Sequence, residues 1–572
     1  MSWDQEVDMI VVGAGGSGLM SAIRAADAGA NVLVLEKSES FGGTTALSGG
    51  CMWIPANHLQ DENLGDSPDL ALKYLRHLSA GTVTDTMLET YIRESRKMLR
   101  YLDRQSDMNL VACTRYCDYY PEVEGGLRGS RTVEPDPYDG QSLGKDRHRL
   151  RDPQKLTLMF GQISLTAREA HTMVTGGKQG SKLAIRKILE YILLFFLRRR
   201  RGRDRRLTLG QGLVAGLWNL ARRKGVKTRF GITVGDLITE NDRVAGVAIT
   251  TAQGSRERIR VRRGIVLACG GFSRNQKMKE EYQQSRAEWG ATVDGDTGDA
   301  YGFCRELKPA TAMMNEAWWM PVMKVPGEDF ARSIVVDRSL PGCIVVDQDG
   351  QRFVNESAPY EDFVRSMRGH DKATPAWLIA DHFHRRNYTL GPLLPGAYYP
   401  RSFWPKGLAG NWIKVAGTLE ELEQLTGIPA GQLQQTVAAF NKDAGRGEDP
   451  AFGRGASAYD RYYADPSVGD NPCLRPLEAG PFYAVQLFPG DLGTKGGFVV
   501  DEKARVVSTS GEAIPGLYAA GNATANPIGN IYPGAGGTLG PGLTFGYIAA
   551  ETILAEEQGN EQDAIAYGSK GS

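Results

Sequence analysis

The chain has 572 residues, enough for more than one domain. Its 67 basic and 67 acidic residues leave no formal net charge, which argues against a general nucleic-acid-binding role. The seven scattered cysteines lack metal-site spacing and indicate reduced thiols in a cytoplasmic protein. Among the histidines only His382 and His384 form a near pair, and we expect both on the surface and no bound metal.

The first predicted unit is a strand, a glycine-rich turn and a helix close to the N-terminus, which leaves no room for a signal peptide. Met9–Val12 is an apolar run typical of a buried parallel strand, Leu19–Ala30 has helical spacing, and Asn31–Leu35 is a second strand. The turn fits G-x-G-x-x-G and consists of Gly13, Ala14, Gly15, Gly16, Ser17 and Gly18. Such a turn brings backbone N–H groups and a helix N-terminus to a pyrophosphate, and Glu36 can bind ribose hydroxyls. We therefore expect a bound dinucleotide.

The next segment, "SFGGTTALSGGCMWIP", favours FAD over NAD. Its glycines let the backbone run close to a flat ligand, and its hydroxyl side chains can donate to phosphate or to the flavin edge. An NAD domain would have no use for this segment, whereas many flavoproteins hold the ADP half of FAD in their first βαβ unit. The expected contact residues here are Lys37, Ser38, Gly43, Thr44, Thr45, Ser48, Gly49 and Gly50.

The rest of the chain divides by its character. Ser67–Leu102 has amphipathic helical patterns, and successive strands then lead to Gly264–Ala268. The pattern changes at about residue 309, and the glycine density of the N-terminus returns after residue 481. We predict an FAD domain from 1–308 and 482–572, with a catalytic domain at 309–481 inserted into it. Its further expected cofactor contacts are Val234, Ala268, Gly270, Gly521, Asn522, Gly537 and Leu539.

The last predicted element is a helix over Leu539–Glu557, with Pro541 in its first turn. If this N-terminus points at the pyrimidine end of the flavin, its dipole stabilises the negative charge of a reduced flavin. The alternative is an ordinary helix start.

Several motifs carry a resemblance to a known family. The N-terminal fingerprint, "FGGTTALSGG" and "GLYAAGN" resemble the fumarate reductase/3-ketosteroid dehydrogenase flavoprotein superfamily. The more selective "DLGTKGG", "NESAPY" and "IYPGAGGTLGPGLTFGY" are similar to 3-ketosteroid Δ1-dehydrogenases. The resemblance implies an α/β fold, with a Rossmann-like FAD-binding domain of the GR2/fumarate reductase type and an inserted α+β catalytic domain. With no Ser-His-Thr-type attachment motif near the N-terminal glycines, we expect non-covalent FAD.

The same resemblance implies the site. These enzymes remove two hydrogens from C1 and C2 of a 3-ketosteroid and pass a hydride from C1 to flavin N5. The carbonyl is polarised by a tyrosine hydroxyl and a glycine N–H, which match Tyr532 and Gly536. The base that takes the C2 proton matches Tyr360, assisted by a second tyrosine. That second residue matches Tyr119, but Tyr120 could take the role instead.

Three other functions stay open at this stage. A fumarate or succinate enzyme would need several Arg and His residues converging on carboxylates, and the matching C-terminal region offers Tyr532 and backbone instead. A ketosteroid Δ4-(5α)-dehydrogenase is a closer alternative. A sterol-binding or electron-relay flavoprotein would not need Tyr532, Tyr360 and Gly536 together.

An insertion at about 180–210 departs from soluble members of the family. Ile192–Leu197 is apolar, and Arg198–Arg201, Arg203, Arg205 and Arg206 follow it. The apolar part is shorter than the about 20 residues that span a bilayer. We expect the segment Ile192–Arg206 to hold the protein on the inner face of a membrane, with the arginines at anionic headgroups. The alternative is burial within the protein or an oligomer interface; RNA binding has no module or aromatic pattern to support it.

A membrane position agrees with a sterol substrate that keeps its aliphatic side chain and resides in the bilayer. The chain is therefore most similar to membrane-associated cholest-4-en-3-one Δ1-dehydrogenases. We expect a quinone or another carrier as electron acceptor, although no residue identifies it.

Overall fold

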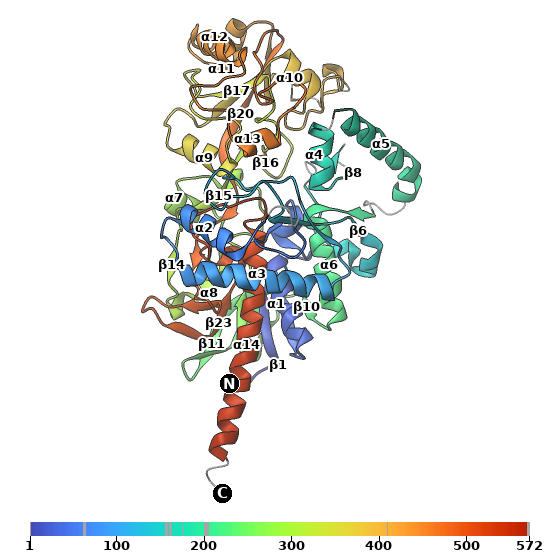
Figure 1. Ribbon diagram of the computed structural model, residues 1–572. Coiled ribbons are helices and arrows are strands. Elements are labelled where there is room, and N and C mark those ends of the chain that lie inside the picture. Colours follow the sequence, from blue (N-terminus) through green and yellow to red (C-terminus); the bar gives the residue numbers. More distant parts are fainter. Residues whose placement is uncertain are drawn as a thin grey trace.

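The computed structural model describes residues 2–60, 65–154, 158–159, 163–175, 177–199, 205–397, 399–405, 407–408 and 410–568. Two lobes are visible in Figure 1, each built around a β-sheet, with the N-terminal strand in the lower lobe. A long helix, α14 (Leu539–Gly568), runs down through the lower lobe and carries the C-terminus away from it.

The sheet of the lower lobe combines strands from distant parts of the chain. Within the described residues its order is β10-β2-β1-β13-β12-β11, with β23 on β13 and β22 on β23. The strands are β1 (Gln5–Val12), β2 (Val32–Leu35), β10 (Lys227–Arg229), β11 (Thr233–Glu240), β12 (Arg243–Thr250), β13 (Arg256–Leu267), β22 (Arg505–Val507) and β23 (Ala513–Ala519). β1, β2, β10, β13 and β23 run parallel, and the apolar residues of β1 and β2 are buried, as expected where helices cover a parallel sheet.

Helices connect and cover this sheet. The predicted first helix is α1 (Gly16–Asp27), which packs against α14 and α6 (Leu209–Arg223). The amphipathic segment forms α2 (Pro68–Ser79) and α3 (Asp85–Gln105), of which α3 also packs on α14. A small sheet of β3 (Met52–Trp53), β5 (Thr132–Pro135) and β4 (Leu110–Ala112) combines the strand before α2 with two strands after α3.

The upper lobe has a mixed layer of strands and helices. Its described sheet has the order β16-β15-β20-β18-β17, with β19 also paired to β20. The strands are β15 (Ala317–Met323), β16 (Arg332–Ser333), β17 (Cys343–Val346), β18 (Ala376–Ala380), β19 (Ile413–Ala416) and β20 (Phe482–Thr494). The helices around it are α9 (Tyr360–Arg368), α10 (His382–Asn387), α11 (Leu419–Thr426), α12 (Gln432–Ala444) and α13 (Ala458–Tyr462).

The position of β20 bears on the domain boundaries. This strand pairs with β15, β18 and β19 of the upper lobe, although the expected boundary before residue 482 assigns it to the FAD domain. On this pairing we propose a boundary after Thr494 in place of the earlier one.

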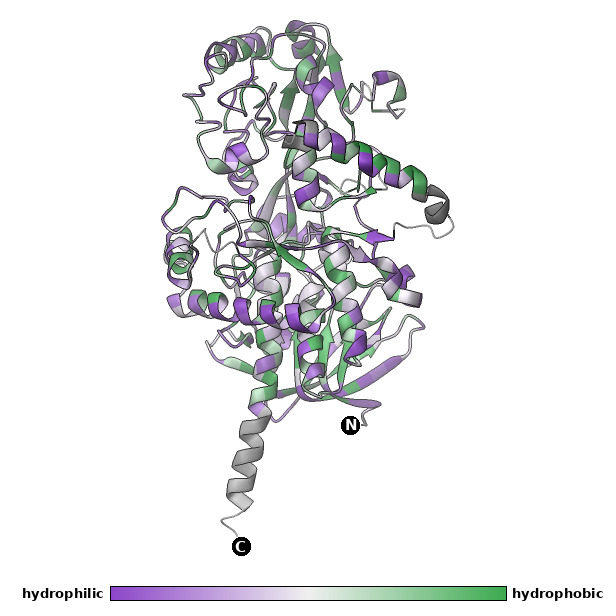
Figure 2. Ribbon diagram, turned by 45° about the vertical axis from the view of Figure 1, so that its right-hand side comes forward, coloured by the Kyte–Doolittle hydropathy of each residue, from purple (hydrophilic) through white to green (hydrophobic). Residues whose placement is uncertain are grey.

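The insertion projects from one side of the molecule. Its first part belongs to α5 (Gly177–Arg199), which packs against α4 (Ala167–Thr175). Both helices stand at the right of Figure 1, and green apolar segments are visible along α5 in Figure 2. Four described large apolar side chains of α5 are more than half exposed: Ile185, Leu189, Ile192 and Leu193. No helix within the described residues is long and apolar enough to cross a bilayer.

Two of the insertion's arginines bind the protein itself. Arg205 forms a two-pronged ion pair with Asp139, with N–O distances of 2.9 and 2.7 Å, and Arg206 pairs with Glu169 at 2.8 Å. Arg200, Arg201 and Arg203, and the side chains of Arg198 and Arg199, lie outside the described residues.

One expectation about the histidines was wrong. His384 is fully buried, and its Nδ1 lies 2.9 Å from the carbonyl oxygen of Pro341, because α10 packs its inner face against the sheet of the upper lobe. Burial lowers the pKa of His384 to about 4. His382, two residues earlier, is exposed as expected.

Candidate active site

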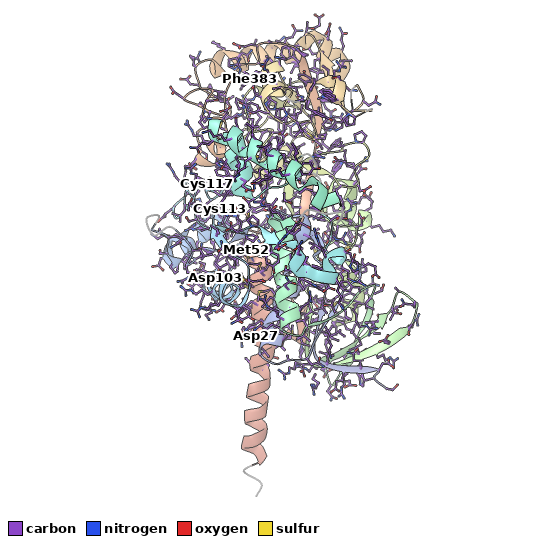
Figure 3. All side chains as sticks on the ribbon, turned by 90° about the vertical axis from the view of Figure 1, so that its right-hand side faces the viewer. Asp27, Met52, Asp103, Cys113, Cys117 and Phe383 are labelled. Carbon is purple, nitrogen blue, oxygen red and sulfur yellow. The ribbon has the colours of Figure 1, made fainter. Side chains whose placement is uncertain are left out.

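A cavity of about 1910 Å³ joins the two lobes. Its wall begins at the glycine-rich turn after β1, passes the loop between β2 and β3, and ends at α10 and the loop that follows it. Cys113 and Cys117, which belong to the segment between the lobes, lie between Met52 below and Phe383 above in Figure 3. The described face of α5 contributes Ser181, Ala184, Ile185 and Ile188 to the same wall.

Most of the predicted cofactor contacts lie on this wall. They are Gly13, Gly15, Gly16, Ser17, Glu36, Lys37, Ser38, Gly43, Thr44, Thr45, Ser48, Gly49, Gly50, Val234, Ala268, Gly270, Gly521, Asn522 and Leu539. Three predicted residues do not line it: Ala14, Gly18 and Gly537. Sequence reasoning missed Arg151, Gln154, Val293, Asp296 and Thr538, which do line it and which follow no recognisable motif.

The turn after β1 needs its glycines for close packing. A Cβ on Gly13, whose φ is +107°, would lie 2.4 Å from the carbonyl oxygen of Ala268, and one on Gly18 would lie 2.1 Å from that of Gly13. A Cβ on Gly15 would instead meet no atom within 4 Å. The inner glycines therefore fold the turn, while Gly15 opens toward the cavity and leaves room for a phosphate.

Glu36 has the position expected for a ribose-binding carboxylate. Its two oxygens each accept a backbone N–H, from Ala14 and Ser38, both at 2.8 Å. Burial raises the pKa of Glu36, and these two hydrogen bonds oppose that shift. Each oxygen retains a free lone pair for a ribose hydroxyl, so this end of the cavity fits the ADP half of FAD.

Three tyrosines meet further along the same wall. The hydroxyl oxygens of Tyr119 and Tyr360 are 2.5 Å apart, and the ring of Tyr532 lies 5.2 Å from each of their rings between centroids. All three side chains are at most 4 % exposed. Burial raises the pKa of each phenol above its ordinary value, so an ionised phenol needs stabilisation from its neighbours.

The choice between Tyr119 and Tyr120 follows from the hydrogen bonds. Tyr120 donates from its hydroxyl to Asp362 Oδ1 at 3.0 Å and does not line the cavity. The backbone N–H of Tyr119 binds the carbonyl of Pro533 at 3.1 Å, which turns its side chain toward Tyr360. Tyr119 is therefore the neighbour of Tyr360.

Buried ion pairs hold the segments that carry this pair of tyrosines. Asp118, just before Tyr119, pairs with Arg131 at 2.8 Å, and burial raises the pKa of its carboxyl to about 6 although Arg131 opposes the shift. Glu361, just after Tyr360, binds Lys495 Nζ through both oxygens at 2.7 and 2.8 Å. Since a buried charge is costly when its partner is lost, these pairs fix the backbone on either side of the phenols.

Gly536 stands beside Tyr532 on the wall. Its φ is +91°, and its carbonyl accepts from Trp53 N at 3.1 Å and from Gly540 N at 2.8 Å. Its own N–H has no acceptor among the described residues, so it is available to a ligand. α14 begins three residues later, and Thr538 and Leu539 at its start also line the cavity.

Comparison with known proteins gives a consistent result. The family model described as "FAD binding domain" matches residues 8–539. The chain is 37% identical to a 3-oxosteroid 1-dehydrogenase of Mycolicibacterium smegmatis over 96% of this chain and 98% of that protein. A 3-oxosteroid 1-dehydrogenase of Comamonas testosteroni is 34% identical, with 97% of both chains covered.

The solved structures include a similar one from Sterolibacterium denitrificans. It is a 3-ketosteroid delta1-dehydrogenase in complex with 1,4-androstadiene-3,17-dione, with 39% identity and a TM-score of 0.93 over 96% of this chain and 100% of that one. A 3-ketosteroid-delta4-(5alpha)-dehydrogenase from Rhodococcus jostii shares the fold, with 23% identity and a TM-score of 0.64 over 97% of this chain and 98% of that one.

Proposed function

This chain belongs to the FAD-binding flavoproteins and is a 3-oxosteroid 1-dehydrogenase. From this premise we propose a role for each of its residues in the desaturation of the steroid A ring. One observation carries the proposal. The paired phenols of Tyr119 and Tyr360, the phenol of Tyr532 and the N–H of Gly536 lie on one cavity wall, which continues to the dinucleotide-binding turn.

The roles follow from the chemistry of a 3-ketone. Loss of the C2 proton places negative charge on the ketone oxygen, and the Tyr532 hydroxyl and Gly536 N–H supply two preorganised donors for it. Tyr360 is the base at C2, and its hydrogen bond to Tyr119 stabilises the phenolate that must form first. Gly15, Glu36 and Ser48 would hold FAD without a covalent bond, and the bound flavin would supply the acceptor of the C1 hydride.

The wall offers little to a dicarboxylate. Of its described arginines, Arg332 is paired with Glu328, and Arg151 donates to Ser38 Oγ at 3.0 Å beside the dinucleotide turn. Succinate or fumarate would need several cations converging near the hydride acceptor. The tyrosine cluster instead fits a neutral ring that carries one ketone.

The test is anaerobic mixing of the purified holoenzyme with androst-4-ene-3,17-dione and with cholest-4-en-3-one. We expect the flavin absorbance to bleach and a 1,4-dien-3-one to form. A saturated 3-ketosteroid that yields only the 4-ene product would indicate Δ4-(5α) chemistry. No bleaching by any of these ketones would refute the assignment.

We also propose that α5 holds the enzyme on a membrane surface, from which a sterol such as cholest-4-en-3-one enters the cavity. The supporting feature is the exposed apolar face of α5, in which Leu193 is 77% exposed, on the helix that also lines the cavity. A quinone dissolved in the same membrane is the proposed electron acceptor.

Sedimentation with vesicles containing anionic phospholipid tests this position. Leu193→Glu should release the protein from the vesicles, whereas Leu425→Glu, at a residue 50% exposed on α11, should not. A change in molar mass by light scattering, with vesicle binding unchanged, would instead assign the face to contact between copies of the chain.

A further inference from the structure

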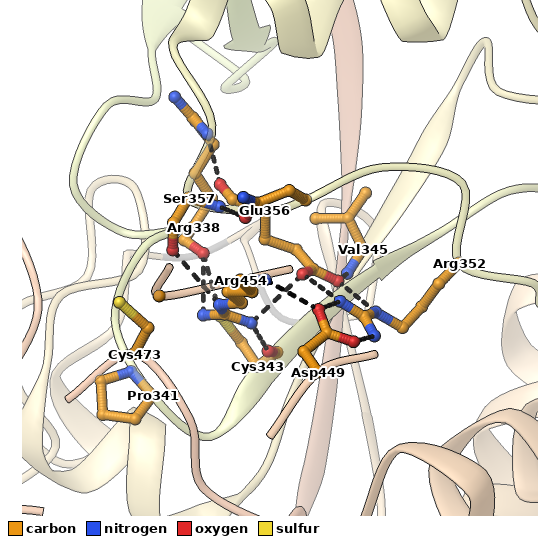
Figure 4. Close-up of polar contacts among 12 residues, drawn as sticks. Arg338, Pro341, Cys343, Val345, Arg352, Glu356, Ser357, Asp449, Arg454 and Cys473 are labelled. Carbon is orange, nitrogen blue, oxygen red and sulfur yellow. Dashed lines mark hydrogen bonds and ion pairs between the residues drawn. The ribbon is translucent and has the colours of Figure 1, made fainter. Parts of the chain in front are cut away.

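A group of buried arginines lies beside β17 in the upper lobe (Figure 4). Arg352 binds two carboxylates, Glu356 at 2.7 Å and Asp449 at 2.8 Å. Arg454 donates to the carbonyls of Cys343 at 2.7 Å and Leu340 at 3.0 Å, and its Nη1 lies 3.4 Å from Glu356 Oε2. Each of these two guanidinium groups therefore has a carboxylate partner.

Arg338 differs from both. It is fully buried, and within the described residues it donates only through Nη1, to the backbone carbonyl of Glu356; its Nε and Nη2 have no acceptor there. Its guanidinium also faces the ring of Phe363 on α9, 4.9 Å from the centroid. A buried cation without a carboxylate partner is costly, and burial accordingly lowers the pKa of Arg338. Such a charge needs an explanation.

The groups around Arg338 include members and neighbours of the tyrosine cluster. The charged and titratable groups that act on it are Tyr459, Asp460, Arg454 and Tyr360. The Tyr459 phenol is buried and has no hydrogen-bond partner among the described residues, and its ring meets that of Tyr119 edge-on at 4.9 Å. Burial raises the pKa of Tyr459, and the charge of Arg338 opposes that shift.

Arg338 lies against the first turn of α9, the helix that begins at Tyr360, through its contact with the Phe363 ring. Tyr119 and Tyr360 line the cavity, whereas Arg338 and Tyr459 do not. Negative charge that forms on the Tyr119–Tyr360 pair lies in a low-dielectric interior, where a nearby uncompensated cation stabilises it strongly. Asp460 acts in the opposite sense, since the negative charge of its carboxylate raises the pKa of Tyr459.

We propose that Arg338 is a positioning residue whose positive charge stabilises the phenolate form of the Tyr119–Tyr360 pair and so increases the fraction of Tyr360 that is ionised at a given pH. This inference rests on the proposed role of Tyr360 as base. Before turnover Tyr360 releases its own proton to solvent. The C2–H bond of the steroid then breaks: the C2 proton moves to the phenolate oxygen of Tyr360, and the electron pair of the broken bond enters the steroid enolate.

The experiment is the pH dependence of anaerobic flavin reduction by androst-4-ene-3,17-dione in the holoenzyme. Without the cation the phenolate is less stable, so Arg338→Met should move the acid limb of the profile upward by about one pH unit. Reduction would then be about tenfold slower at any pH below the limb, and close to wild type above it. Arg338→Lys keeps the charge, so the acid limb of this variant should lie close to its wild-type position.

Two further variants separate this role from a structural one. Arg368→Met removes a guanidinium that stacks on Trp319 at 4.1 Å on the far part of α9, and it should leave the limb in place. Asp460→Asn should move the limb to lower pH, so the proposal stays testable if Arg338→Met folds poorly.

The outcomes are distinct. A loss of rate in Arg338→Met that Arg338→Lys does not restore, or a limb that Asp460→Asn leaves in place, would overturn the role of Arg338 alone. A wild-type flavin that no 3-ketosteroid bleaches would overturn the proposed function itself.

Discussion

Gly536→Ala is the substitution whose effect the structure predicts most directly. At φ +91° an alanine loses about 1–2 kcal/mol relative to glycine. The new Cβ would also lie 2.6 Å from the backbone atoms of Cys51 and Met52, where contacts of about 3.5–4 Å are comfortable. Because backbone cannot rotate away, the turn that carries Gly536 must shift by about 1 Å.

Such a shift moves one of the two donors for the ketone oxygen. Loss of a single donor of this kind costs about 10²–10³ in rate. We therefore expect the rate of anaerobic flavin reduction by androst-4-ene-3,17-dione to fall by that factor, with FAD still bound. The denaturant midpoint should fall as well.

Gly511 provides the matched control. It has the same φ of +91°, but a Cβ there would meet no atom within 4 Å. Gly511→Ala should therefore carry the backbone strain alone, with a small loss of stability and wild-type flavin reduction. If Gly536→Ala reduced its flavin at the wild-type rate and unfolded at the same denaturant midpoint as Gly511→Ala, the argument from close packing would be refuted.

Three other predictions concern the base and the cofactor. Tyr360→Phe should slow flavin reduction by about 10²–10⁴, while Tyr120→Phe, which loses only the bond to Asp362, should change it little; equal effects in stopped-flow would contradict the assignment. Because burial holds the pKa of Tyr360 well above 10, the wild-type rate should rise about tenfold per pH unit from neutral pH upward, and a flat profile would exclude a phenolate base. Glu36→Ala should weaken FAD binding tenfold or more, since the two expected charge-assisted hydrogen bonds from the ribose hydroxyls to the carboxylate are lost. The measurement is the flavin retained on dialysis, and full retention would show that the ribose binds elsewhere.

The features that sequence predicted well are local. The turn at Gly13–Gly18 lies between two strands and is followed by Glu36, so strand, turn and carboxylate are readable within one stretch. The structure accordingly has β1, α1 and β2 at nearly the expected residues. Ala14 and Gly18 fit the motif yet lie behind the wall, because the motif records what the turn needs to fold as well as what touches the ligand.

The features that sequence could not provide depend on partners far along the chain. Tyr119 and Tyr120 are adjacent and chemically identical, and only contacts with distant residues, Tyr360 for the first phenol and Asp362 for the second, distinguish their roles. β20 reads as an apolar strand that either sheet could accept, and its pairing with β15 and β18 places it in the upper lobe.

The insertion shows why residue type alone predicts a surface incompletely. Its arginines suggested one cationic face, but Arg205 and Arg206 bind Asp139 and Glu169 and so attach the end of the insertion to the body of the protein. The apolar residues of α5 form one stripe, because Ile185, Ile188, Leu189 and Ile192 follow each other at helical spacing. Ala184, Ile185 and Ile188 line the cavity, and Ile185, Leu189, Ile192 and Leu193 are each more than half exposed.

An apolar stripe on a helix is normally buried against another surface. Here the first part of the stripe faces the cavity, and the part from Leu189 onward lies open unless something apolar covers it. Since both parts belong to one helix, a surface that covers the exposed part would also lie close to the cavity wall. A substrate that partitions into lipid would then reach the tyrosines without crossing bulk water. This links the substrate proposal and the membrane proposal: Leu193→Glu should slow turnover of vesicle-bound cholest-4-en-3-one, while turnover of the more soluble androst-4-ene-3,17-dione stays at the wild-type rate.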